Sequence, residues 1–359
     1  MTKHLLSKYV CLLLAMLCLA SCDVHQWPVP NNEGEPDAVI TPETKYAYLS
    51  LHLEYLTDMY YWEHTYNSRT GAVSAVSGSL DDDYYDNIDN IIQGTRMEVT
   101  VKVHKDNSYR TLVSSESFIV NPEENFDTDV NIKIPAGTDY VITVWSQLLD
   151  ENEESLYDNS DFNAIGLIRQ KYTGNTDMRD AFRGRIYISV PDEGVLYENI
   201  VMKRPMGKME FITTDLKDFF TSETKRLQGS NGTVNPDDYM VVISYPYYYP
   251  CSFTAMDDRV ENALGGYSFS SPLVLNNADE SGTSLGFDYV LMNDTENGAV
   301  QVQVALFYRD GTQVANTGMM TVPIKRDRHT VVRGNFLKSN NGGGIGIDPD
   351  FDGEFNIPM

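Results

Sequence analysis

The chain has 359 residues, and its 52 acidic and 27 basic side chains give a formal net charge of −25 at pH 7. A surface this acidic repels nucleic acid and anionic lipid headgroups, which excludes both as expected partners. The length exceeds that of a usual single core and accommodates two domains.

The first residues have the layout of a secretory signal. Lys3, His4 and Lys8 give a positively charged start, and an apolar run follows over residues 9–19. This run is about half of the ~20 residues that a membrane-spanning helix requires. The sequence therefore predicts a cleaved leader and not a membrane anchor.

The end of this leader resembles a bacterial lipoprotein box. Leu19 and the small residues Ala20 and Ser21 precede Cys22, and the resemblance implies cleavage between Ser21 and Cys22. Residues 1–21 would then be the signal peptide, and Cys22 would carry acyl chains such as palmitate. Because two or more acyl chains hold a protein stably at a bilayer, outer-membrane lipid is an expected partner through Cys22. The alternative is an ordinary cleaved signal with a coincidental cysteine.

The remaining cysteines indicate a fold without disulfides. Cys11 and Cys18 leave with the leader and Cys22 is the lipid site, so Cys251 stands alone in the mature chain. An exported protein with one spare thiol must gain its stability from packing. We expect Cys251 to be a small buried apolar residue and not a nucleophile.

After an acidic, Pro-rich tether at residues 22–44, the sequence alternates between apolar and polar residues. In residues 47–53 the apolar residues recur at every second position, which predicts a half-buried strand. The same period, or a continuous apolar run, predicts strands at 97–103, 130–134, 140–145, 186–190, 209–211, 240–245, 287–292 and 300–306. Short strands separated by Gly, Pro, Asn and Asp favour an all-β fold of antiparallel β-sandwiches over a parallel α/β fold.

Helices are predicted only as short insertions. Apolar residues at helical intervals predict one helix over 215–227, and a second is expected over 176–183. Pro205 and Gly207 lie between two strand-like runs. We therefore expect two sandwiches in tandem, an N-terminal domain at 45–205 and a C-terminal domain at 206–359.

Two acidic clusters invite interpretation as calcium sites. Residues 348–354 have the spacing that opens an EF-hand loop, but its twelfth position would be Met359, which is not the required glutamate. Residues 81–89 hold a second dense group of carboxylates. Solvated acidic loops are the favoured interpretation of both clusters, and bound Ca²⁺ is the alternative.

No motif of catalysis or cofactor binding stands out. The histidines after the leader are scattered over His25, His52, His64, His104 and His329. They lack zinc spacing, and neither a G-x-S-x-G elbow nor a phosphate-binding glycine loop is present. The sequence predicts no enzyme activity, no metal and no cofactor, with a hydrolase built from dispersed residues as the least favoured alternative. His52 and His104 alternate with apolar residues, so both are expected in solvent.

Aromatic residues gather in two places, residues 60–62 and 245–249. If exposed, such amphipathic rings suit contacts with protein or sugar. Tyr247 and Tyr248 are the candidates for ligand contact. The alternative is that these rings close the ends of a sandwich.

Three stretches resemble the fimbrillin superfamily of Bacteroidales-type (type V) pili, and they are closest to its lipoprotein anchor and accessory subunits. The first is the junction at residues 196–211, which contains the 203–211 motif, and the second is the tail at residues 322–337 and 343–357. The third, residues 23–28 directly after the lipid cysteine, looks like uncharacterised members of this group. The resemblance implies two transthyretin-like Greek-key sandwiches without enzymatic activity. It also implies assembly by strand donation, in which an extended segment of one subunit fills a groove of another.

The resemblance also suggests a role within such an assembly. Phe351, Phe355 and Ile357 are the candidates for a donated strand. Stalk subunits of this superfamily lose their first strand to an Arg-specific protease, and the first candidate here, Arg69, lies beyond the strand predicted at 46–53. This favours a subunit that keeps its lipid.

The sequence therefore predicts a surface-exposed lipoprotein of the outer membrane that acts as a fimbrial anchor, accessory or adhesin subunit. Its expected partners are other fimbrial subunits or further copies of itself. A surface lipoprotein that binds a glycan or a host protein on the same scaffold is the alternative.

Overall fold

The computed structural model describes residues 45–76, 96–105, 111–121, 128–228, 234–274, 282–295 and 298–338. Lys45–Met359 is one compact unit. Strands dominate the described ranges, which confirms the predicted all-β class. Several predictions lie outside these ranges: Ser21 and Cys22, the donated-strand residues Phe351, Phe355 and Ile357, and both acidic clusters.

Two sheets form the part of the fold built mainly from the first half of the chain. A three-stranded sheet has the order β11 (Val195–Met202), β1 (Tyr46–Tyr55), β6 (Thr128–Pro135). A four-stranded sheet has the order β10 (Ala181–Ser189), β7 (Asp139–Leu148), β4 (Met97–Lys105), β5 (Thr111–Val120). Strand β1 alternates as predicted, with Leu49, Leu51 and Leu53 in the core.

Two five-stranded sheets follow. One has the order β17 (Thr283–Leu291), β12 (Met206–Thr213), β21 (Arg328–Gly334), β2 (Tyr60–Tyr66), β3 (Val73–Ala75). The other has the order β16 (Tyr267–Pro272), β13 (Tyr239–Tyr245), β18 (Ala299–Tyr308), β19 (Gln313–Asn316), with β20 (Met320–Pro323) also paired to β18. A small sheet has the order β15 (Arg259–Leu264), β14 (Tyr249–Thr254), β9 (Ile165–Leu167), β8 (Tyr157–Asp158).

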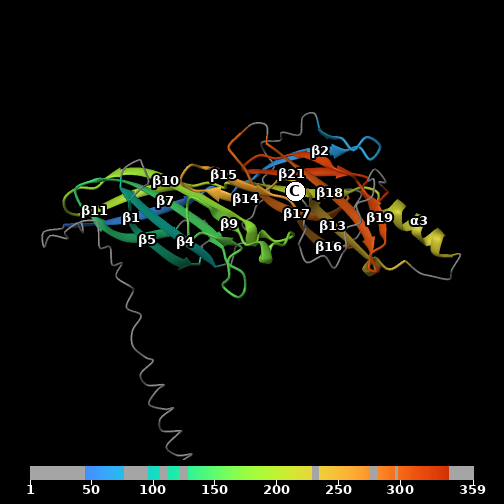
Figure 1. Cartoon of the computed structure of the whole chain (residues 1–359), viewed down its shortest axis with the longest axis horizontal. Helices are drawn as coiled ribbons and strands as arrows, with labels where there is room; N and C mark the ends of the chain where they lie inside the picture. Colours follow the sequence, from blue (N-terminus) through green and yellow to red (C-terminus); the bar gives the residue numbers. More distant parts are fainter. Residues whose placement is uncertain are drawn as a thin grey trace, which may run out of the picture. The chain divides into compact units, whose positions relative to one another are not determined.

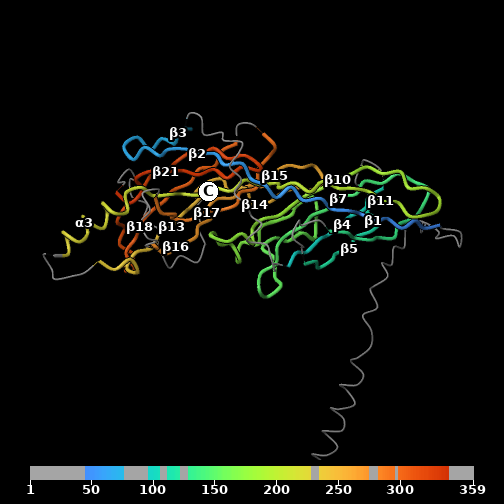
Figure 2. The backbone as a smooth tube through the Cα atoms, turned by 180° about the vertical axis from the view of Figure 1, so that it is seen from behind, coloured from blue at the N-terminus to red at the C-terminus, as the bar shows by residue number. Residues whose placement is uncertain are grey.

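Strand pairing crosses the boundary expected at residue 205. Strand β2 lies parallel to β21, and Figure 1 shows this blue strand beside the red end of the described chain. In the other direction β9 pairs with β14. The view from behind shows β2 beside β21 as well (Figure 2). The division into 45–205 and 206–359 remains a prediction, and the strands on its two sides share sheets.

One of the two predicted helices is confirmed. Helix α3 (Leu216–Gln228) buries Leu216 and Phe219, and the ring of Phe219 meets that of Tyr239 edge-on at 5.3 Å. The helix expected at 176–183 is wrong. A three-residue 3-10 turn, Asp177–Arg179, stands there, and β10 begins at Ala181. Two similar turns lie at Arg169–Lys171 and Pro236–Asp238.

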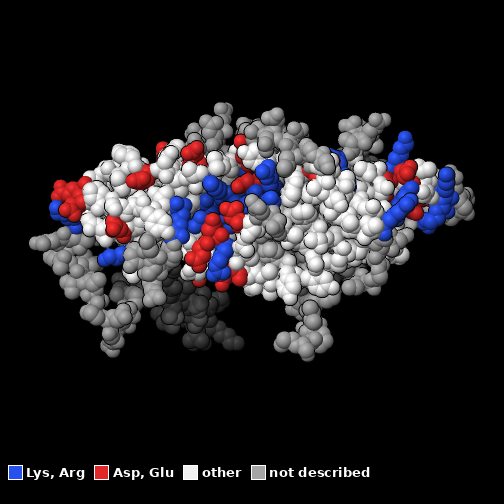
Figure 3. Space-filling model, turned by 90° about the horizontal axis from the view of Figure 1, so that it is seen from above, with Lys and Arg blue, Asp and Glu red and all other residues white. Residues whose placement is uncertain are grey.

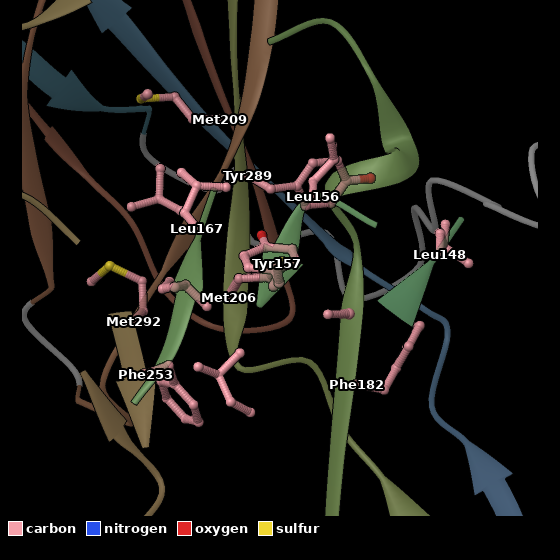
Figure 4. Packing of buried hydrophobic residues seen from close by; sticks show 14 of the residues in the cluster. Leu148, Leu156, Tyr157, Leu167, Phe182, Met206, Met209, Phe253, Tyr289 and Met292 are labelled. Atoms are coloured by element: carbon pink, nitrogen blue, oxygen red, sulfur yellow. The ribbon is translucent and has the colours of Figure 1, made fainter. Parts of the chain in front are cut away.

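Buried side chains from all the larger sheets join into one hydrophobic core. Figure 4 shows Tyr157, Met206, Phe253 and Tyr289 together, although they come from four different strands. Each large side chain buried in this way contributes about 1.5–3 kcal/mol. Cys251 belongs to the same core, and burial raises the pKa of its thiol. The prediction that Cys251 is buried is therefore confirmed.

Candidate functional site

A cluster of buried charges lies where strands from both halves of the chain meet. Arg179 and Asp288 form an ion pair, and each is only 1% exposed. The hydroxyl groups of Tyr172 and Tyr245 donate to Asp288 at 2.8 Å each. Burial raises the pKa of both tyrosines well above its usual range, so their hydroxyls stay protonated as donors.

Strongly shifted pKa values often mark catalytic groups, but this cluster is directed inward. Arg179 also donates to Tyr249, at 2.5 Å from its hydroxyl, and Tyr249 donates to the carbonyl of Tyr289 at 2.9 Å. The partners are thus other buried protein groups. The cluster ties the 3-10 turn at 177–179 to β14 and β17, and we assign it to stability.

The residues of the 203–211 motif hold a second buried pair. Arg204 and Asp180 are fully buried, and Arg204 Nε lies 2.9 and 2.8 Å from the two carboxylate oxygens. Arg204 Nη1 donates to the carbonyl of Thr57 at 2.6 Å. Arg204 therefore fixes the link between β1 and β2 and directs β2 into the sheet of β12 and β21.

The outer side of the three-stranded sheet carries exposed aromatic and aliphatic residues. We call this the outer face and define it by Tyr46 and Tyr48 of β1 with Val195 and Tyr197 of β11. Tyr48 pairs with Val195 across the two parallel strands, and Tyr197 is 76% exposed. Lys133 of β6 lies 4.5 Å from the centre of the Tyr46 ring. A sheet face of this kind is typical of a contact surface.

Strands β11 and β5 are also edge strands of their sheets within the described residues. They have eight and ten residues, and each contains a single charged side chain, Glu198 or Glu116. Proteins usually protect long edges with charges, proline or bulges because an unpaired backbone accepts another strand. These two edges are therefore the places where strand addition is easiest.

The aromatic run at 245–249 divides between core and surface. Tyr245 and Tyr249 are completely buried, whereas Tyr247 is 53% and Tyr248 80% exposed. The buried pair closes the core, as the alternative interpretation expected, and the two exposed rings lie in the turn between β13 and β14. Their role as ligand contacts remains a prediction.

Of the two histidines that were expected in solvent, one is exposed and the other is buried. His52 is in contact with solvent and lies 2.8 Å from Asp129. His104, also expected in solvent, is buried at 7% exposure, and burial lowers its pKa. The sequence period identified the core face of β4 correctly, but the opposite face of β4 is covered as well. Sequence reasoning also missed the buried pair of His329 and Glu210, 3.0 Å apart.

Neither a metal cluster nor a membrane-spanning helix occurs in the described part of the chain. No three His, Cys, Asp or Glu side chains there are arranged to hold a metal ion. Within the same ranges, no helix combines the length and the apolar character needed to cross a membrane.

Solved structures similar to this chain include fimbrial proteins. One is the fimbrial anchor protein Mfa2 from Porphyromonas gingivalis, with 10% sequence identity, a TM-score of 0.38, and coverage of 75% of this chain and 81% of that one. Another is a fimbrial assembly protein from Parabacteroides distasonis, with 12% identity, a TM-score of 0.37, and coverage of 82% of this chain and 92% of that one. A third is a candidate adhesin from Bacteroides thetaiotaomicron (9%, 77% and 81%, TM-score 0.43).

None of the curated proteins matches the chain. One family model matches residues 52–359, and its description is "Family of unknown function (DUF6562)". This match covers most of the chain and nearly all of the residues that the structure describes. The chain belongs to this family.

Proposed function

We propose that the protein is a cell-surface subunit associated with a fimbria, of the anchor, accessory or adhesin type, and that it joins its partners through sheet edges. The observation that carries this proposal is the edge strand β11, which is unpaired on one side in the described residues and bears the exposed Val195 and Tyr197. The similarity to fimbrial anchor and assembly proteins supports it. We further propose that acylated Cys22 holds the subunit at the outer membrane.

The physical basis of this association is β-augmentation. A strand added to β11 would form main-chain hydrogen bonds along the free edge, and its alternate side chains would pack on the outer face. Val195, Tyr197 and Val201 point outward at every second position of β11. The backbone supplies affinity in such a contact, and the pattern of side chains supplies specificity.

Placing charges on this edge should block association without unfolding the protein. We expect the double variant Val195→Lys/Tyr197→Lys to lose the partners that co-purify with the wild type from its native outer membrane. Both positions are more than half exposed, so the stability should change by only about 0.5 kcal/mol. Cross-linking followed by mass spectrometry of the purified complexes measures the loss.

Val274→Lys is the matched control, because Val274 is exposed to 46% beyond the end of β16, away from β11. It should retain the partners. Equal retention by both variants would show that β11 is not the assembly edge.

The lipid anchor is tested separately. Cys22→Ala should move the protein from the membrane pellet to the soluble fraction, because acylation at Cys22 would be its attachment. Cys251→Ala, which removes the buried thiol in the core, should stay in the pellet. The mass of the N-terminal peptide of the wild type reports acylation directly, and an unmodified Cys22 would contradict this part of the proposal.

A further inference from the structure

A basic pocket lies beside strands β10 and β11 in a chain that is otherwise strongly acidic. Its volume is about 770 Å³, and its walls come from β10, β11, the link into β12, and the loops at 258, 294–295 and 325–328. Seven of its lining residues are Lys or Arg and three are Asp. In Figure 3, Lys and Arg side chains gather with Asp and Glu near the middle of one face.

Only part of this positive charge is neutralised within the protein. Asp258 lies 2.9 Å from Arg326 Nη1 and 3.5 Å from Arg183 Nη1, so it serves two cations. Asp294 lies at the exposed rim of the pocket. Asp258, Arg326 and Arg183 therefore neutralise one another in part, and Asp294 faces solvent.

Three other cations form no ion pair with any residue that the structure describes: Lys203, Lys325 and Arg328. Aromatic rings hold two of them in place. Lys325 Nζ lies 5.3 Å from the centre of the Trp62 ring, and the Arg328 guanidinium lies 4.5 Å from that of Tyr60. A ring of this kind orients a cation without cancelling its charge.

A buried donor at the pocket wall also lacks a partner. Arg204 is fully buried and uses Nε and Nη1 in hydrogen bonds, but its Nη2 has no acceptor among the residues that the structure describes. Buried donors are almost always paired. Arg204 lines the pocket but its guanidinium is closed off from solvent, so it adds positive charge behind the wall and does not contact a ligand directly.

We propose that this pocket binds a compact ligand that carries two or more oxyanion groups, such as carboxylate, sulfate or phosphate. The volume lies within the range of roughly 300–1,000 Å³ that is usual for small-molecule sites. Arginine is suited to such groups because its planar donors match two oxygens at once. Lys203, Lys325 and Arg328, which have no ion-pair partner among the described residues, supply the attraction. This inference does not depend on the proposed assembly role.

Asp327 makes the binding depend on pH. Burial raises the pKa of this carboxyl to about 6, against the influence of Arg204, Arg326 and Lys203, with Asp180 as its acidic neighbour. Above that pH Asp327 is ionised and repels an anion. Below it the carboxyl is neutral, so the affinity for an anion should rise as the pH falls through 6.

Isothermal titration calorimetry on the mature full-length protein tests the proposal with three probes: citrate, inorganic phosphate and a sulfated disaccharide. Tryptophan emission gives a second readout, because Lys325 lies on the ring of Trp62, one of the three tryptophans. We expect saturable binding of at least one probe, weakened by salt. Lys325→Gln/Arg328→Gln should lower the affinity about tenfold or more. Lys217→Gln, which removes one positive charge from an exposed lysine on α3, should leave it unchanged.

The probes distinguish the source of the oxyanion. Preference for citrate assigns a free carboxylate ligand, preference for phosphate assigns a phosphorylated ligand, and preference for the disaccharide assigns an acidic sugar. The sulfated probe does not titrate near pH 6, so its affinity should rise below that pH in the wild type and stay constant in Asp327→Asn.

Three outcomes would overturn the proposal. The first is that no probe shows saturable binding at millimolar concentration. The second is that Lys325→Gln/Arg328→Gln and Lys217→Gln bind the probe with equal affinity. The third is that an acidic peptide binds although none of the compact anions does. If the double variant does not fold, which circular dichroism shows, Lys203→Gln alone replaces it. Its side chain is exposed, so its folding should be unaffected and the same reduction is required.

Discussion

Replacing Asp288 by alanine is expected to lower the free energy of unfolding by about 4 kcal/mol. The substitution leaves the guanidinium of Arg179 buried without its ion-pair partner. It also deprives the hydroxyls of Tyr172 and Tyr245 of their acceptor. Breaking one side of a buried pair is costly because the remaining charge has no access to water.

Urea denaturation followed by circular dichroism measures this loss. The control is Lys45→Ala, which removes an ion pair with Glu193 between side chains that are 59% and 77% exposed. Solvent screens such a pair, so the control should be indistinguishable from the wild type. If Asp288→Ala also left the free energy of unfolding unchanged, the buried cluster would not stabilise the fold.

A second substitution separates the orphaned charge from the lost packing. Adding Arg179→Met to Asp288→Ala removes the uncompensated guanidinium while it keeps a long apolar side chain in the same space. The double variant should therefore be more stable than Asp288→Ala alone. A double variant that is less stable would show that the charge was not the cause.

The strands could be predicted because their signal is local. In β1 a buried residue follows an outward one along the whole strand, so the period is visible in the sequence itself. In β7 nearly every residue is buried, and the continuous apolar run already predicted a central strand. Helix α3 has the same advantage, since one face of the helix packs and the other is solvated.

The organisation of the sheets could not be predicted because pairing partners are remote in sequence. Strand β2 has little alternation, and its partner β21 begins more than 250 residues later. The wrongly predicted helix at 176–183 has the same cause. The local pattern does not show that Asp288, 109 residues after Arg179, and Arg204 hold Arg179 and Asp180 in the core.

The surfaces assigned here also combine several segments. The exposed Tyr247 and Tyr248 could be anticipated from their sequence, since they form one run. The basic pocket could not, because its cations come from β10, the link before β12 and the loop before β21. The net negative charge of the whole chain gives no indication that basic side chains gather at one place.

Gly207→Ala is expected to lower the free energy of unfolding by about 3 kcal/mol. A methyl group at this position would lie 2.9 Å from Ile324 Cγ1 and closer still to the carbonyl oxygen of Lys325. Neither neighbour can retreat easily. Ile324 is completely buried and its amide donates to Gly298, while the amide of Asp327 donates to the carbonyl of Met206.

Gly166→Ala is the matched control for this substitution. Gly166 also lies in a strand, β9, but the nearest atom to an added methyl group is 3.9 Å away, so stability should be unchanged or slightly increased. Equal urea midpoints for the two variants would show that the close approach of β12 to the 324–327 segment is not required. A urea midpoint that falls for Gly207→Ala but not for Gly166→Ala would explain physically why the 203–211 motif has a glycine at position 207. At this position the backbone of β12 must touch the loop that carries Lys325 and Asp327 into the basic pocket.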